Sequence, residues 1–262
     1  MDQVLFSDVN DPSDIEVLAF SPHPDDVEIF AGGTVAQLSS KHIVGLIDLT
    51  EGELSSRGDV ATRRMEADAA GRALGCVYRE NLGIPDGRLT SSDEATHAAV
   101  SVLRRCRPSI VLIPWSEARH PDHSGAHALL KRALFLANLV KFAPELGEPI
   151  SVPFVVMYEM RVEMQFSFLL DISSYLDKKR AAIKCYASQV KSNHGAVQGN
   201  PSFLYTELGS QTIESRTQYY GAMIGAAHAE PLALMGPIGV SDVSELCSVL
   251  SSTSHYVYPR RG

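Results

Sequence analysis

The sequence predicts an α/β fold, with a Rossmann-like, open, mostly parallel sheet, helices on both faces and an active site at the C-terminal ends of the strands. Apolar runs of strand length alternate four times with helix-forming segments, which is typical of right-handed βαβ units. The run over residues 43–50 is nearly continuous in apolar residues, as expected for a strand that a parallel sheet buries on both sides. Polar clusters directly follow two of the runs, at the place where such sheets bind ligands. The four runs cover residues 15–20, 43–50, 76–82 and 110–114.

The first two predicted strands are each followed by a helix. The strand over residues 15–20 leads through a polar turn into a helix that continues over 35–40. The second strand ends in a loop, residues 50–59, that is too polar for a core. A helix over residues 61–74 follows, and Gly75 is placed to terminate it. The charged residues of this helix are expected to face solvent: Arg63, Arg64, Glu66 and Asp68.

The next two strands repeat the alternation. The third strand is closed by residues 83–87, which carry Pro and Gly where tight turns favour them. A helix over residues 92–107 begins at Ser91 or Ser92 as its cap, and Pro108 breaks it. The fourth strand precedes a second polar cluster, and a helix over residues 124–142 comes next.

The C-terminal part of the chain has a weaker pattern. Residues 188–202 are rich in Gly, Asn and Ser, which predicts a mobile loop or lid. We expect one domain over residues 1–250 and a flexible tail over 251–262. The remaining predicted elements are strands over 154–160 and 166–171 and helices over 174–186 and 207–229.

Composition narrows the possible partners. Among 262 residues, 23 Lys and Arg face 31 Asp and Glu, and the net charge of −8 argues against nucleic-acid binding. No apolar run approaches the roughly 20 residues that span a bilayer, and the N-terminus lacks the basic start of a signal peptide, so we expect a cytoplasmic protein without a membrane partner. The four cysteines form no C-x-x-C pair, which argues against a disulfide framework and a thiolate zinc site. A small-molecule partner fits these features best.

The turn after the first strand concentrates one imidazole and several carboxylates. His23 and Asp26 are both residue types that ligate zinc, at about 2.0 to 2.2 Å, which leaves Asp25 beside the metal without binding it. A bland alternative is that Asp26 caps the next helix and Asp25 is solvated. Taken alone, the turn does not separate these interpretations.

A second cluster, His120-Pro121-Asp122-His123, follows the fourth strand and repeats the same chemistry. Two such turns on one sheet edge can supply His23, Asp26 and one further histidine to a single cation. Three protein ligands plus water is the open arrangement of a catalytic zinc site. The histidine that does not bind metal is then available to act on substrate. His127, four residues after His123, is more typical of a helix-surface histidine than of a ligand.

These motifs resemble those of the LmbE-like (PIG-L) zinc-dependent N-deacetylases. The resemblance rests first on residues 22–28 with the Gly32-Gly33 pair, and on the motif at 120–123. Further segments are similar to the bacillithiol-biosynthesis type, the N-acetylglucosaminyl-malate deacetylases: residues 49–54, 56–58, 81–87 and 237–240. The resemblance extends from about Val17 to Leu246.

The resemblance implies a role for each position that matches. It makes His23, Asp26 and His123 the metal ligands, Asp25 the general base, and His120 a protonated electrophile oriented by Asp122. It places sugar-binding side chains at Arg57, Asp86 and Glu53, and it leaves Arg161 and His194 as candidates for a carboxylate of the substrate.

The implied activity is removal of the N-acetyl group from an N-acetylglucosaminide, with N-acetylglucosaminyl-malate as the expected substrate. Alternatives are another conjugate, of inositol for example, or free N-acetylglucosamine and chitooligosaccharides, or a non-catalytic metal-containing sugar-binding protein. The expected metal is Zn²⁺, with Fe²⁺ also compatible with two histidines and one aspartate. Relatives of this kind form trimers or hexamers, so a homo-oligomer is expected. A dinucleotide-binding oxidoreductase is disfavoured, because no G-x-G-x-x-G follows the first strand.

Overall fold

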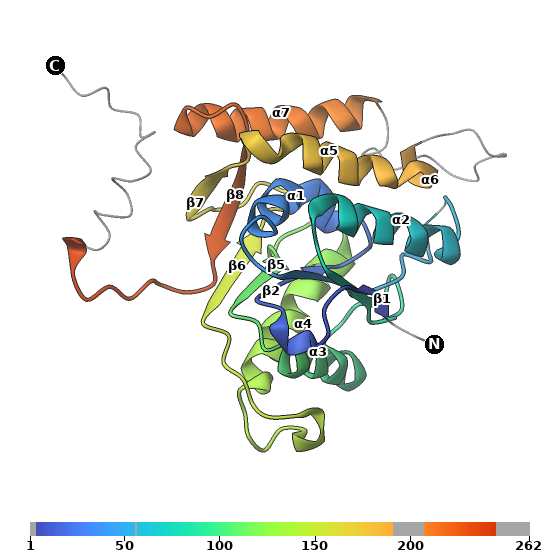
Figure 1. Cartoon of the computed structure of the whole chain (residues 1–262), viewed down its shortest axis with the longest axis vertical. Coiled ribbons are helices and arrows are strands. Elements are labelled where there is room, and N and C mark those ends of the chain that lie inside the picture. The colour runs from blue at the N-terminus through green and yellow to red at the C-terminus, as the bar shows by residue number, and fades with distance from the viewer. Residues whose placement is uncertain (1–3, 56, 191–206, 245–262) are drawn as a thin grey trace.

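In the computed structural model, which describes residues 4–55, 57–190 and 207–244, the chain forms a mixed sheet of eight strands in the order β1-β4-β3-β2-β5-β6-β8-β7 (Figure 1). The five strands from β4 to β6 are mutually parallel, whereas β1 and β8 run antiparallel to their neighbours. The predicted fold class is confirmed. The strands are β1 (Val4–Ser7), β2 (Val17–Ser21), β3 (Val44–Asp48), β4 (Tyr78–Asn81), β5 (Ile110–Pro114), β6 (Phe154–Tyr158), β7 (Phe168–Asp171) and β8 (Ala229–Leu234).

Helices cover both faces of this sheet (Figure 1). The helices α3 and α4 lie on one face, and α1, α2 and α5 lie on the other, while α7 packs on β7 and β8. The helices are α1 (Asp26–Leu38), α2 (Val60–Leu74), α3 (Asp93–Cys106), α4 (Pro121–Ala137), α5 (Leu176–Cys185), α6 (Ala187–Val190) and α7 (Glu207–Ile224). Three short 3-10 turns lie at Pro12–Asp14, Pro144–Leu146 and Ser173–Tyr175.

Alternate residues of the central strands fill two cores. Leu18 and Phe20 belong to the core against α3 and α4, whereas Val17 and Ala19 belong to the core against α1 and α2. All four side chains are fully buried. Burial on both faces explains why β2 is apolar at four consecutive positions, from Val17 to Phe20, rather than at every second one.

The position of β2 decides where a ligand can bind. From β2 the chain passes through α1 to β3 on one side and then to β4, and it returns through α3 to β5 on the other side. Because the strand order reverses at β2, the C-terminal ends of β2 and β5 border a crevice. The two polar clusters of the sequence follow these two strands.

Local signals in the sequence set most helix ends. Asp59 caps α2 by accepting a hydrogen bond from the Thr62 amide over 2.7 Å, and Gly75 ends that helix with φ of 86°. Ser92 caps α3, as expected for one of the two candidate serines. The helix α4 begins at Pro121 rather than at residue 124 and ends at Ala137, five residues before the predicted end.

Two strands were not predicted. The strand β1 lies at the sheet edge, and β8 begins at Ala229, the last residue of the segment expected to be helical over 207–229. The helix α7 ends at Ile224 because Gly225 adopts φ of 70°, and β8 contains Glu230 and Pro231, which are poor strand formers. Tertiary contacts therefore override a weak local signal here.

Part of the predicted lid is ordered in a different form. Residues 187–190 form the short helix α6, and Ser188 donates to Glu66 through its backbone amide and its hydroxyl. The rest of the predicted lid, the predicted tail and the predicted domain boundary at residue 250 lie outside the described residues. No helix in the described ranges is long and apolar enough to cross a membrane.

Candidate active site

The first cluster lies on a sharp turn between β2 and α1. Asp25 adopts φ of 117°, a left-handed conformation that residues other than glycine rarely adopt, and it immediately precedes the first residue of α1. Its side chain makes no capping hydrogen bond and is buried, 6% exposed. The alternative in which Asp26 caps the helix and Asp25 is solvated is therefore wrong, because Asp26 is already the first residue of α1 and Asp25 is buried. Strain of this kind persists only where surrounding contacts fix it, and it clusters at functional sites.

The second cluster forms the start of α4. Pro121 takes the first helical position, where its missing N–H costs nothing. The Asp122 carboxylate accepts hydrogen bonds from the Gly87 amide over 2.6 Å and from the Leu89 amide over 3.2 Å. These bonds fasten the turn after β4 to the start of α4. A Cβ atom at Gly125 would lie only 2.0 Å from the Leu89 carbonyl oxygen, so this contact requires glycine.

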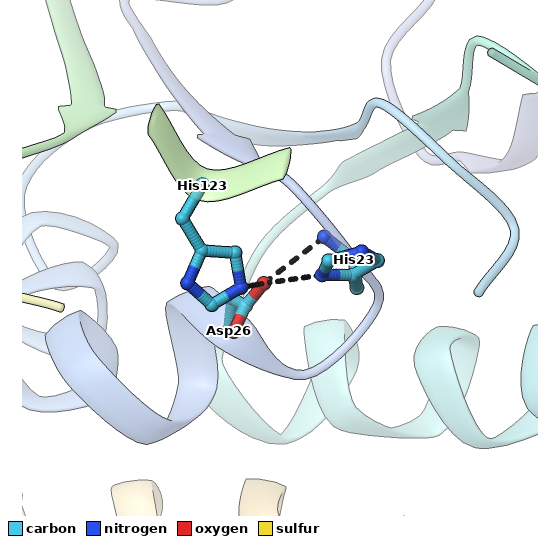
Figure 2. Close-up of side chains that lie close together, drawn as sticks. All are labelled: His23, Asp26 and His123. Carbon is cyan, nitrogen blue, oxygen red and sulfur yellow. Dashed lines mark hydrogen bonds and ion pairs between the residues drawn. The ribbon is translucent and has the colours of Figure 1, made fainter. Parts of the chain in front are cut away.

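His23, Asp26 and His123 converge on one point (Figure 2). Asp26 Oδ2 lies 3.1 Å from His23 Nδ1 and 3.1 Å from His123 Nε2. Two ligands of a tetrahedral zinc ion with bonds of 2.0 to 2.1 Å lie about 3.3 Å apart, so the separations suit a shared ion. Two imidazoles and one carboxylate, mostly buried, are also a donor set that such a metal prefers. These three residues therefore form a group that can hold a metal ion, and their role as ligands of a catalytic metal stays a prediction.

A second group, His23, His120 and Asp122, also brings its donor atoms within 4.8 Å of one another. It shares His23 with the first group. Asp122 is already fixed by the two backbone amides of the 87–89 turn. The first group is the better metal site, because Asp26 Oδ2 lies 3.1 Å from a ring nitrogen of each of its two histidines. This is close to the separation of two ligands that bind the same ion.

The charges of these groups are strongly interdependent. Burial acts to raise the pKa of Asp26, but the charge of His123 and the hydrogen bonds from His123 and His23 outweigh it and lower the pKa. Burial acts to lower the pKa of His23, but hydrogen bonds to Asp122, Asp26 and Asp86 outweigh it and raise the pKa well above its usual range. The three surrounding carboxylates thus stabilise a positive charge on His23.

Arg63 was expected to face solvent, and this expectation is wrong. Its side chain is buried, and Nη2 donates to Asp25 Oδ2 over 3.0 Å and to the Pro24 carbonyl over 2.8 Å. Burial raises the pKa of the Asp25 carboxyl well above its usual range, and the Arg63 charge opposes the rise. A sequence signal existed, because Arg63 lies on the same helical stripe as the buried residues Ala67, Ala70 and Leu74.

His120 is oriented by a different contact from the one expected. Its Nδ1 accepts a hydrogen bond from the Asp122 backbone amide over 3.2 Å, while the Asp122 carboxylate bonds to the 87–89 turn and lies 3.4 Å from His23 Nε2. An Nδ1 that accepts must carry a lone pair, so the neutral imidazole holds its proton on Nε2. Burial and the neighbouring His23 and His123 lower the pKa of His120, and the Asp122 charge offsets less than this. The structure therefore favours a neutral His120, which the Asp122 backbone amide orients in place of the expected carboxylate.

A buried ionic network supports the turn from below. Arg79 on β4 is fully buried, and it donates to both carboxylate oxygens of Asp48 over 2.8 Å and to Glu28 over 2.6 Å. The Tyr186 hydroxyl donates to the same Glu28 oxygen over 2.9 Å. The network links α1, β3 and β4 under the metal-binding turn.

The helix α1 carries a break that separates the turn from the rest of the helix. Ala31 has φ of −134° inside α1. The amides of Gly33 and Thr34, which the break frees, donate to the Glu230 carboxylate over 3.0 and 2.7 Å, and Lys179 pairs with the same carboxylate. A side chain from β8 thus caps the second half of α1, which gives this unpredicted strand a role in shaping the site.

A pocket of about 270 Å³ opens over the metal-ligating residues. Its lining includes the predicted residues Asp86 and Arg161, and also Arg63, Arg119 and Gln189, which sequence reasoning did not select. Asp86 Oδ1 lies 3.1 Å from His23 Nε2.

Arg57 and Glu53, two of the predicted sugar-binding residues, lie outside this lining. The Arg57 side chain donates to the Gln189 carbonyl and lines a small neighbouring cavity. Glu53 Oε1 accepts from the Asp86 amide over 2.7 Å and so positions that loop. His194 lies outside the described residues. His127 Nδ1 donates to the Pro114 carbonyl over 3.0 Å, and His127 belongs to neither of the potential metal groups.

The chain is similar to characterised proteins across most of its length. The PIG-L family, described as GlcNAc-PI de-N-acetylase, matches residues 18–134. The diacetylchitobiose deacetylase of Thermococcus kodakarensis is 30% identical over 240 residues, covering 85% of this chain and 84% of that protein. The 4-oxalmesaconate hydratase of Pseudomonas putida is 31% identical over 191 residues, covering 66% of this chain and 73% of that protein.

A solved structure has a similar fold. The crystal structure of the conserved protein TT1542 from Thermus thermophilus shares 34% identity with this chain and superposes with a TM-score of 0.77, covering 86% of this chain and 97% of that one. Both motifs of the site lie within the residues that the family matches. The chain therefore belongs to the PIG-L (LmbE-like) deacetylase family.

Proposed function

We propose that this protein is a metal-dependent hydrolase that removes the N-acetyl group from an N-acetylglucosaminide. The observation that carries the proposal is the convergence of His23, Asp26 and His123 around one point, with Asp25 buried next to them but outside the ligand set. A carboxylate that is adjacent to a metal site and free of it is suited to a base. Family membership supports the same reaction.

A divalent metal held by these three residues would polarise the acetyl carbonyl and make a nearby water more acidic. Asp25 accepts a proton from the attacking water and returns it to the departing amine nitrogen. Arg63 holds Oδ2 of Asp25, which leaves Oδ1 for the water. General-base catalysis of this kind contributes about 10² to 10⁴ in rate.

His120 is suited to stabilise the oxyanion that forms as water adds to the acetyl carbon. Its Nε2–H is the free donor, because Nδ1 is occupied by the Asp122 amide. A preorganised donor aimed at developing negative charge contributes through electrostatics. In this proposal Asp122 positions His120 through its backbone and holds the turn at 87–89 through its carboxylate.

For the substrate we propose N-acetylglucosaminyl-malate, on the resemblance to the bacillithiol-biosynthesis type. Asp86 and Arg161 line the pocket and are available to bind it. Glu53 and Arg57 shape the loop beside the pocket, so in this proposal they act on the sugar indirectly. The similarity to the diacetylchitobiose deacetylase keeps chitooligosaccharides as alternatives, and inositol conjugates, free N-acetylglucosamine and a non-catalytic sugar-binding role are also tested below.

A substrate panel tests this proposal. Acetate release is measured with the Zn²⁺-loaded and the Fe²⁺-loaded protein on N-acetylglucosaminyl-malate, the inositol conjugate, N-acetylglucosamine and diacetylchitobiose. We expect the highest kcat/KM for the malate conjugate. Higher values for another conjugate reassign the substrate, and binding without acetate release from any compound favours the non-catalytic alternative. Light scattering on the same samples tests the expected trimer or hexamer.

A hydratase is the second candidate, because one relative at 31% identity is a 4-oxalmesaconate hydratase. Hydration also requires an activated water, which Asp25 and a bound metal are placed to provide. The discriminating experiment is the absorbance change when 4-oxalmesaconate is added to the metal-loaded protein. Hydration with no acetate release from the sugar panel favours this candidate over the deacetylase.

A further inference from the structure

The helix α1 is kinked a short distance after the proposed metal ligand Asp26. Ala31 has φ of −134° and ψ of 15°, values that lie outside the helical region. Residues 26–30 therefore form a separate first turn, and the longer part of the helix begins after Ala31. The position of Asp26 depends on how the kink joins these two parts.

Glu230 on β8 binds the backbone immediately after the kink. Its Oε1 accepts a hydrogen bond from the Gly33 amide over 3.0 Å, and its Oε2 accepts from the Thr34 amide over 2.7 Å and the Thr34 hydroxyl over 2.6 Å. In a regular helix these two amides donate to carbonyls four residues earlier, which here belong to the first turn. The carboxylate thus supplies acceptors from outside the helix, as a capping side chain does at a helix start.

Two glycines let a further element reach this cap. A Cβ atom at Gly33 would lie 2.6 Å from Cδ1 of Ile172, and one at Gly32 would lie 3.1 Å from Cγ of Lys179. The close approach brings Lys179 Nζ, from α5, to 2.5 Å from Glu230 Oε1. Neither glycine lines the pocket over the metal-ligating residues, so the Gly32-Gly33 pair of the sequence motif acts in packing behind the site.

Stability alone is a weak explanation for the charged pair behind the kink. Glu230 is 1% exposed and Lys179 is 2% exposed. Taking two charges out of water costs free energy that offsets much of their attraction, and apolar residues of similar volume are often as stable. The pair is better explained by what the carboxylate fixes, which is the geometry of the kink.

Phe30 lies in the first turn and lines two cavities. One is the pocket over the metal-ligating residues, and the other is a cavity of about 40 Å³ whose wall includes Ile29 and Glu230. A cavity removes packing partners from the side chains that line it. The first turn is therefore held less by packing than by its connections at either end, of which the kink at Ala31 is one.

We propose that Glu230 is a positioning residue for the metal site, because it fixes the kink in α1 and thereby the direction of the first turn that carries Asp26. The Ile29 amide donates to the Asp25 carbonyl over 2.9 Å, so the proposed base moves with this turn. The inference rests on the metal-dependent function proposed above. It adds a residue that does not line the pocket over the ligands.

The test removes the cap without leaving a buried charge unpaired. In the double variant Glu230→Gln/Lys179→Met the side chains keep similar volumes, but the amide group offers one acceptor oxygen where the carboxylate offers two. We expect the dissociation constant for Zn²⁺, measured by competition with a chromogenic chelator, to rise by about 10-fold to 100-fold, the range typical of residues that orient metal ligands. With saturating Zn²⁺, kcat for acetate release should fall by about tenfold with KM little changed, because neither residue lines the pocket.

The matched control is Glu80→Gln/Arg105→Met, which removes another ion pair with a buried carboxylate. Glu80 lies on β4 and is 4% exposed, and it pairs with Arg105 on α3, which covers the other face of the sheet from α1. We expect this control to bind Zn²⁺ as the wild type does. Urea unfolding of both double variants shows whether a loss of metal affinity merely follows a loss of stability.

A smaller change keeps the test available if the Glu230 double variant does not fold. Thr34→Val removes only the hydroxyl bond to Glu230 and keeps the shape of the side chain. We expect it to raise the dissociation constant for Zn²⁺ by about threefold, as the loss of one hydrogen bond implies. An unchanged constant in this variant would then reject the inference.

Two results overturn the inference. One is a Zn²⁺ affinity of Glu230→Gln/Lys179→Met equal to that of the wild type, and the other is an equal loss of affinity in the control. Either result leaves the deacetylase proposal intact, because the wild type still binds metal and releases acetate. If the wild type binds no metal, hydrogen exchange of the metal-free proteins still tests the kink. We expect faster exchange at the amides of residues 27–31 in the Glu230 double variant than in the control, and equal rates reject the inference.

Discussion

Arg63 donates from Nη2 to Oδ2 of Asp25 over 3.0 Å, although the two residues are 38 positions apart in the chain. The same guanidinium also binds the Pro24 carbonyl through Nε and Nη2. It therefore holds the Asp25 carboxylate and the carbonyl of the peptide bond before it. These contacts fix Asp25 although its φ of 117° is unfavourable. This contact fixes the direction in which the proposed base points.

The first prediction concerns this contact. Arg63→Lys keeps the charge but loses the bonds to Pro24, so Asp25 should be less well positioned. We expect kcat for acetate release to fall by about 10-fold to 100-fold, as the loss of one charge-assisted hydrogen bond implies, with the metal content unchanged. Arg64→Lys, at the next position of α2, is the control. Equal activity of the two variants would remove Arg63 from the site.

The second prediction separates the base from the ligands. Asp25→Asn should bind one metal ion per chain but lose about 10² to 10⁴ in kcat, because the amide cannot accept the proton of water. His123→Ala should lose the metal itself, since two ligands remain. Elemental analysis and kinetics on the same samples check both. A metal-free Asp25→Asn, or a fully active one, contradicts the assignment.

The third prediction concerns the close approach of α4 to the turn after β4. In Gly125→Ala the new Cβ would lie 2.0 Å from the Leu89 carbonyl oxygen, so the start of α4 must move. We expect a loss of about 1 to 3 kcal/mol in the free energy of unfolding, together with weaker metal binding through displaced His123. Ser124→Ala is the control, measured by urea unfolding. If the two variants are equally stable, the start of α4 is more adaptable than the contact indicates.

The fourth prediction concerns the ionic network below the site. Arg79→Met leaves Asp48 and Glu28 buried without their cation, and both are fully buried. Removing one partner from such a network costs about 3 to 5 kcal/mol in the free energy of unfolding. Arg132→Met breaks an exposed pair and should change stability by about 0.5 kcal/mol or less. Similar losses in both variants would show that burial of Arg79 has no special role.

The fifth prediction is a pH dependence of stability. Burial lowers the pKa of His127, which lies against the Pro114 carbonyl. A histidine whose pKa is lower in the folded state contributes stability above its unfolded pKa of about 6.5, and this contribution is lost as the pH falls below that value. Unfolding by urea at pH 7.5, 6.5 and 5.5 should therefore show a shallower decline in His127→Asn, which keeps a donor for Pro114 but cannot titrate. A steeper decline in the variant would show that the sign is wrong.

The sequence alone predicted the parallel part of the sheet and the edge at which the proposed metal ligands lie, because both depend on local patterns. Continuous apolar runs predict parallel strands, and a polar cluster after each of two strands must lie at the edge where parallel strands end. His23, Asp26 and one further histidine follow from those two rules together with ordinary ligand chemistry. The resemblance to a family then selected His123 as that histidine and added a role for Asp25.

Only the tertiary structure decided which side chains support and complete the site. The sequence predicts that Arg63 lies at the surface. In the structure α2 packs against the turn that carries Asp25, and this contact buries Arg63. Glu230 lies in an unpredicted strand and reaches α1 across 196 positions to cap Thr34. Arg119 and Arg161 line one pocket because β5 and β6, which precede them in the chain, are neighbours in the sheet. Such pairings depend on which elements pack together, and a single sequence records the periodicity of each element but not the partner that it meets in space.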